Sequence, residues 1–99
     1  MSTDMNLGRR AIHDKLESQI TIAQARLETL KAKAEAAKAN AELKAIADLL
    51  TAKRAIDRKV DELRKSGETT YQQVKTDVES SVAAFEKSVQ AIETRFKAA

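Results

Sequence analysis

Residues 16–63 read LESQITIAQARLETLKAKAEAAKANAELKAIADLLTAKRAIDRKVDEL, an uninterrupted stretch without Pro or Gly. Apolar residues recur along it at steps of three and four, which is the spacing of one face of an α-helix. The first part steps like a heptad seam, and the part after residue 41 repeats every eleven residues, which favours straight packing. The pattern therefore predicts one long helix that needs a partner along its length. Its apolar positions are Leu16, Ile20, Ala23, Leu27, Leu30, Ala34, Ala37, Ala41, Ala45, Leu49, Ala52, Ile56, Val60 and Leu63.

The composition limits the chain to one small helical domain. It has 99 residues, of which 33% are charged and 3% aromatic, and it contains no Cys. Such a chain is short for a sizeable core, and charges of both signs interspersed along it are typical of a solvated helix surface. The lack of Cys excludes disulfides and thiolate metal ligands. Because no apolar run resembles a membrane span or an export signal, we expect a soluble, cytoplasmic protein.

The one clear helix stop is the stretch Arg64-Lys65-Ser66-Gly67, in which cations precede a glycine suited to the left-handed conformation. Capping boxes that begin at Thr69 or Thr70 follow it. Tyr71 lies beside this turn, where its ring can cap the core while its hydroxyl stays in water. Within a single domain we therefore expect a disordered N-terminus over residues 1–8, a long helix over 9–65, a turn over 66–69 and a second helix over 70–97.

The short turn predicts an all-α fold, an antiparallel helical hairpin of one long and one shorter helix with coiled-coil-like packing. In this hairpin the second helix leaves residues 10–37 uncovered. Their apolar side chains would then join a second copy of the chain, most simply in a two-fold dimer. These self-association residues are Leu16, Ile20, Leu27 and Leu30.

The alternative architecture is a three-helix bundle, in which the long helix breaks near Asn40. This bundle buries every apolar seam within one chain. We prefer the continuous helix, because residues 38–42 contain neither Gly nor Pro and alanine is the strongest helix former.

The titratable residues predict neither an enzyme nor a metal or cofactor site. His13 and Glu17 lie one turn apart and offer two metal ligands, fewer than a site needs. We interpret His13 as a solvated residue near a helix end. Asp57 and Asp61 lie among cations, which favours ion pairs over an acid–base couple.

Positive charge is concentrated in the predicted long helix. Residues 9–65 hold fourteen Lys and Arg against nine Asp and Glu, in a chain whose formal net charge is +3. The densest group, which we name the basic stripe, could contact phosphates without sequence preference. Carboxylates interleave with it, however, and no aromatic or amide side chain is placed to read bases. The basic stripe consists of Lys53, Arg54, Arg58, Lys59, Arg64 and Lys65.

A longer pattern runs through most of the chain beyond residue 16. It comprises Leu27-x-x-Leu30-Lys31-Ala32-Lys33-Ala34-Glu35, then Leu63 and Tyr71-x-x-Val74-Lys75-x-x-Val78-Glu79, and finally Phe85, Val89 and Arg95-Phe96. This pattern resembles a group of small bacterial coiled-coil proteins described as stress-response proteins of unknown mechanism. The resemblance implies a helical hairpin and a role under stress, and it implies no active-site residue.

The sequence thus predicts a non-enzymatic structural or interaction protein that acts through self-association. A second helical protein is a further candidate partner. The alternative function is non-specific binding of nucleic acid or an anionic membrane surface through the basic stripe.

Overall fold

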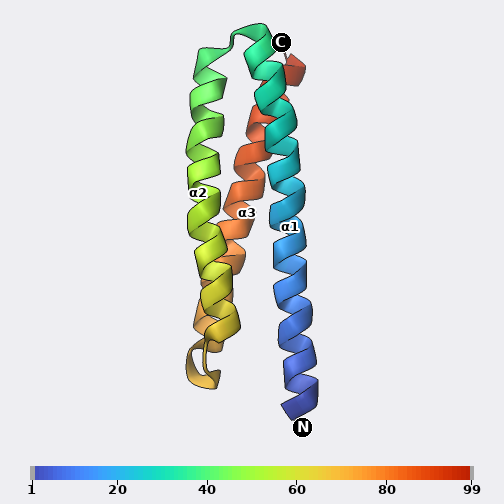
Figure 1. The fold of residues 1–99 in the computed structure, drawn as a ribbon, viewed down its shortest axis with the longest axis vertical. Coiled ribbons are helices and arrows are strands. Elements are labelled where there is room, and N and C mark those ends of the chain that lie inside the picture. Colours follow the sequence, from blue (N-terminus) through green and yellow to red (C-terminus); the bar gives the residue numbers. More distant parts are fainter. Residues whose placement is uncertain (1, 99) are drawn as a thin grey trace.

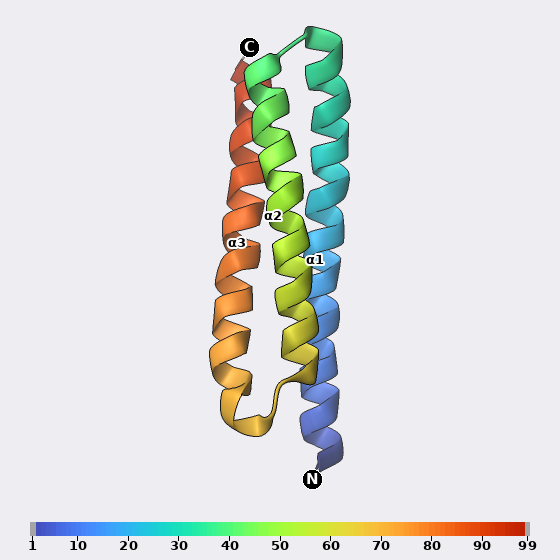
Figure 2. The same cartoon turned by 60° about the vertical axis from the view of Figure 1, so that its left-hand side comes forward.

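The computed structural model describes the backbone of residues 2–98 and the side chains of residues 8–97. Its regular elements in that range are all α-helices, namely α1 (Ser2–Ala37), α2 (Asn40–Lys65) and α3 (Glu68–Ala98). They form an up-down-up bundle of 54 × 17 × 17 Å, in which each helix contacts the other two (Figure 1). Figure 2 shows the same bundle from another side, with α2 antiparallel to both neighbours. The prediction of an all-α fold is confirmed.

The core is a single column of apolar side chains to which all three helices contribute. Most of the predicted seam positions are buried, but the seam of α2 is displaced, because Ile46 is buried whereas Ala41 and Ala52 are exposed. No helix in the described range is long and apolar enough to cross a membrane. The buried residues are Leu16, Ile20, Ala23, Leu27, Leu30 and Ala34 of α1, Ile46, Ile56, Val60 and Leu63 of α2, and Tyr71, Val78, Val82, Phe85, Val89 and Ile92 of α3.

The predicted hairpin is correct only in part. α2 and α3 are antiparallel neighbours, but the expected long helix over residues 9–65 is divided into α1 and α2, so the alternative three-helix bundle describes the fold. Leu16, Ile20, Leu27 and Leu30 are each at most 3% exposed, packed in the core of their own chain. Burying each of them is worth roughly 1.5–3 kcal/mol, whereas one left-handed residue at a helix break costs about 1–2 kcal/mol. Burial within the chain therefore outweighs the alanine-rich preference for one helix. Because these four side chains are buried in their own chain, they do not form an exposed apolar surface that would favour a dimer.

The break between α1 and α2 is a helix C-cap with lysine in the place where glycine is usual. Lys38 has a φ of 56°, in the left-handed region. Its N–H donates to the Glu35 carbonyl at 3.2 Å, and the Ala39 N–H donates to the Ala34 carbonyl at 2.9 Å. This pair of bonds is the Schellman arrangement, which satisfies carbonyls at the helix end. No Gly or Pro marks the break, so composition alone could not locate it.

Replacing Lys38 with Gly is expected to raise the free energy of unfolding by about 1 kcal/mol, because Gly adopts positive φ without a steric cost. Urea unfolding followed by circular dichroism measures the change. Lys38→Ala is the matched control, since it removes the charge but keeps the strained conformation. Equal stabilisation by both variants would assign the effect to charge and contradict the backbone argument.

The turn between α2 and α3 also differs from the predicted one. Gly67 does not have a positive φ, so the expected left-handed glycine is absent. Ser66 instead ends α2 in an extended conformation, with φ −69° and ψ 147°. Its N–H and its Oγ both donate to the Leu63 carbonyl, at 3.3 and 2.8 Å. The chain therefore leaves α2 at Ser66, which has an extended backbone conformation.

α1 and α3 both begin earlier in the sequence than predicted. α3 begins at Glu68, and the Gly67 carbonyl accepts the N–H of Tyr71 at 3.0 Å, so the predicted capping boxes do not start this helix. α1 begins at Ser2 rather than at residue 9. Residues 2–8 are therefore helical instead of disordered, and Met1 lies outside the described residues.

Candidate anion-binding site

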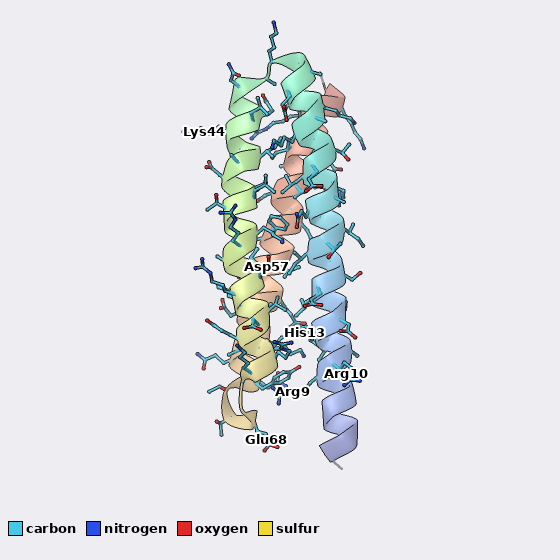
Figure 3. All side chains as sticks on the ribbon, in the orientation of Figure 1. Arg9, Arg10, His13, Lys44, Asp57 and Glu68 are labelled. Carbon is cyan, nitrogen blue, oxygen red and sulfur yellow. The ribbon has the colours of Figure 1, made fainter. Side chains whose placement is uncertain are left out.

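A hollow of about 480 Å³ lies at the end of the bundle where α2 turns into α3. Figure 3 shows Arg9 and His13 extending from α1 toward this end of α2. Three arginines and one aspartate are among its lining residues, which gives the lining a formal charge of +2 when His13 is neutral. We name it the arginine hollow. Its lining residues are Arg9, Arg10, His13, Asp14, Leu63, Arg64 and Tyr71.

Arg9 is held in place by the end of α2 and by Tyr71. Its Nη2 donates to the Ser66 carbonyl at 2.7 Å and to the Leu63 carbonyl at 3.3 Å. The last carbonyls of a helix carry partial negative charge, so Arg9 acts as a C-cap supplied by another helix. Its guanidinium carbon also lies 4.2 Å from the centroid of the Tyr71 ring, in a cation–π contact. The orientation of this cation is therefore fixed before any ligand arrives.

Arg10 and Arg64 are exposed cations at the rim of the arginine hollow. Arg64 lies 3.0 Å from a carboxylate oxygen of Asp61, and Lys65 lies 3.0 Å from the other oxygen. The hydrogen bond from Lys65 is the main cause that lowers the pKa of Asp61, and Arg64 adds to it. Within residues 8–97, Arg10 has no salt bridge. The rim thus offers one free guanidinium and one that shares its carboxylate with a lysine.

Tyr71 contributes a buried hydroxyl without a hydrogen-bond partner among the described residues. The residue as a whole is 9% exposed. The prediction that this hydroxyl stays in water is therefore wrong. A buried polar group without a partner costs roughly 1–3 kcal/mol, and a water molecule or a ligand usually satisfies it.

The basic stripe does not form one continuous cationic face. Four of its six cations pair with carboxylates, while Arg54 and Arg58 have no salt bridge to any described side chain. Lys59 points to α3, where its Nζ also lies 3.2 Å from the Ser81 hydroxyl, and Arg64 joins the arginine hollow. The pairs are Lys53–Asp57 at 2.7 Å, Lys59–Asp77 at 3.3 Å, Arg64–Asp61 at 3.0 Å and Lys65–Asp61 at 3.0 Å.

His13 is enclosed rather than solvated, since its side chain is 17% exposed. Its Nδ1 lies 3.7 Å from Asp14, and its Nε2 lies 3.5 Å from Glu17. His13, Asp14 and Glu17 each offer one ligand atom within 4.8 Å of the other two, which is close enough to hold a metal ion. Asp14 and Glu17 are exposed, however, and exposed carboxylates are often grouped without an ion. A smaller hollow of about 210 Å³ connects this side of α1 to Asp57 and Asp61 of α2. His13 thus lies among acidic residues of both α1 and α2.

A second polar contact fixes the parallel pair of α1 and α3 away from the arginine hollow. Arg26 binds the carboxylate of Glu93 through two of its nitrogens, and its Nε lies 3.0 Å from Oε2. The hydrogen bond from Arg26 is the main cause that lowers the pKa of Glu93, and the same bond raises the pKa of Arg26. Both groups are partly exposed, so we assign this pair to helix register rather than to a site.

No protein-family model, no curated protein and no solved structure matches this chain. The resemblance to small bacterial stress-response proteins is therefore not supported by any of these comparisons. The arginine hollow stands on its geometry alone.

Sequence reasoning missed two of the three arginines in the hollow. Arg64 belongs to the predicted basic stripe, whereas Arg9 and Arg10 lie more than fifty residues earlier. Only the three-helix register brings residue 9 beside Ser66. A prediction built on the alternative bundle could have found them, because in that bundle the N-terminal part of α1 lies beside the turn between α2 and α3.

Proposed function

We propose that this chain is a non-enzymatic interaction protein that binds the phosphate backbone of nucleic acid at the turn end of its bundle. The observation that supports the proposal is the arginine hollow, which is lined by Arg9, Arg10 and Arg64 from two helices. Arginine presents a planar fork of donors that matches phosphate oxygens. Arg54 and Arg58 add two exposed cations on α2 that have no salt bridge to any described side chain.

The surface favours a nucleic acid over a lipid membrane. Helices that lie on lipid need large apolar groups beside their cations. Among the described side chains Ile22 is the exposed large hydrophobic residue, at 58% exposure, and it stands alone. A phosphate backbone requires no such insertion, and it is recognised without sequence preference by positive charge.

Fluorescence anisotropy with a labelled single-stranded oligonucleotide at low salt tests the proposal. We expect Arg10→Gln together with Arg64→Gln to weaken binding about a hundredfold or more, because charge-assisted hydrogen bonds are worth about 1.5–3 kcal/mol each. Lys44→Gln together with Lys87→Gln is the matched control, since it removes two exposed charges that do not line the hollow.

Three results would contradict the proposal. They are no binding at low salt, an equal loss in the control variant, and flotation with anionic vesicles in place of binding to the oligonucleotide. Self-association and a role under stress stay predictions. The residues expected to form the self-association interface are buried within the chain, which weakens the first of them.

A further inference from the structure

We infer that the arginine hollow holds a single phosphate monoester of a small molecule. The inference goes beyond the proposed function and does not depend on it, although both use Arg10 and Arg64 as phosphate ligands. It assigns to the hollow a ligand of its own, a small molecule that is not part of a nucleic-acid strand.

The dimensions suit a small molecule. At about 480 Å³ the hollow falls within the roughly 300–1,000 Å³ that small-molecule sites occupy. Leu63 and Tyr71, which are 1% and 9% exposed, line it as buried residues. Arg10 and Arg64 line it as exposed residues. The hollow thus joins a buried wall to a charged rim.

Arg9 supplies a cation that needs little ordering on binding. Its Nη2 is committed to the end of α2, including the Ser66 Oγ at 3.3 Å. Its Nε and Nη1 have no hydrogen-bond partner among the described residues, so these donors remain for an anion. A preorganised guanidinium loses less side-chain entropy when it binds than a mobile one.

The charge favours a dianion. The three arginines and Asp14 leave the hollow with a formal charge of +2. A phosphate monoester carries about −1.5 to −2 near neutral pH, whereas a phosphodiester or a carboxylate carries a single negative charge. The monoester therefore neutralises the hollow, and the two monoanions do not.

Tyr71 contributes its ring to this site. It lines the hollow, and the Arg9 guanidinium carbon lies 4.2 Å from the ring centroid. Its hydroxyl is buried without a partner among the described residues, so the ring, and not the hydroxyl, is the part of Tyr71 that contacts the cation.

Amide chemical shifts recorded by NMR during titration test the inference at constant ionic strength. The probes are inorganic phosphate, adenosine 5′-monophosphate and dimethyl phosphate. We expect saturable shifts at residues 9–14, 63–66 and 71 with the first two probes and binding about tenfold weaker with the diester. Phosphate saturating alone, without the nucleotide, would assign the hollow to free phosphate and contradict a small-molecule monoester.

Variants separate a built site from general attraction. Arg10→Gln and Arg64→Gln should each weaken monophosphate binding about tenfold, while Lys44→Gln should leave it unchanged. Shifts that grow without saturation, or equal affinity for dimethyl phosphate, would overturn the inference. Oligonucleotide binding with no saturable monophosphate site would overturn this inference but not the proposed function. Saturable monophosphate binding without oligonucleotide binding would support the inference and overturn the nucleic-acid partner.

Discussion

A chain that carries Leu27→Glu together with Leu30→Glu is expected to unfold at neutral pH. Leu27 is 0% exposed and Leu30 is 3% exposed, both in the core column of the bundle. Truncating one buried leucine to alanine already costs about 2–5 kcal/mol, and burying an unpaired carboxylate costs more. Two such changes exceed the roughly 5–15 kcal/mol that holds a small domain folded. Circular dichroism should show loss of helicity and of a cooperative thermal transition.

The matched control places the same two charges, at the same spacing, on the opposite face of α1. Ile22→Glu together with Ala25→Glu changes exposed positions and should keep the cooperative transition. If the Leu27 and Leu30 variant instead stays helical and cooperative while a larger assembly falls to monomers, these leucines join separate chains. The bundle described here would then be wrong, and the extended hairpin dimer would be right.

Replacing Arg9 with Met is expected to lower the free energy of unfolding by about 2 kcal/mol. The change keeps an apolar stem but removes the hydrogen bonds to the Leu63 and Ser66 carbonyls and the contact with the Tyr71 ring. Hydrogen bonds from a charged donor contribute about 1.5–3 kcal/mol, and an exposed cation–π contact adds about 0.5–1 kcal/mol. Partial exposure of the site keeps the expected total near the lower part of that sum.

Urea unfolding measures the Arg9 effect, and Arg10→Met is the neighbouring control. Arg10 is exposed and makes no salt bridge within the described residues, so its replacement should change stability by less than about 0.5 kcal/mol. Equal destabilisation by the two variants would show that the loss of one positive charge, and not the loss of the cap on α2, lowers the free energy of unfolding.

The apolar seam of α1 could be predicted because burial imposes the helical period on the sequence. The break at Lys38 could not, because its local signal points the other way. Alanine-rich residues around it favour a continuous helix, and only the burial of Leu16 and its neighbours in the folded chain compensates for a left-handed lysine. Ile46 was missed for a related reason, since the seam of α2 restarts at the break and does not continue the register of α1.

The candidate site was predictable only in part. Arg64 stood out as a cation near a helix end, but charge density alone favoured Lys53 and Lys59 equally, and both pair with carboxylates in the folded chain. Arg9 carries no local signal, because its role depends on a carbonyl 57 residues away. Tertiary register, rather than composition, decides which cations remain available.

An odd number of helices has a mechanical consequence. The up-down-up course places Ser2 and Ala98 near opposite ends of a bundle 54 Å long (Figure 1). Copies fused tail to head would therefore line up end to end, and each repeat would lengthen the array by about one bundle. Two-helix or four-helix units have both chain ends on the same side, so fusing them would not lengthen the array in this way. A three-helix bundle is therefore suited to serve as a stiff spacer.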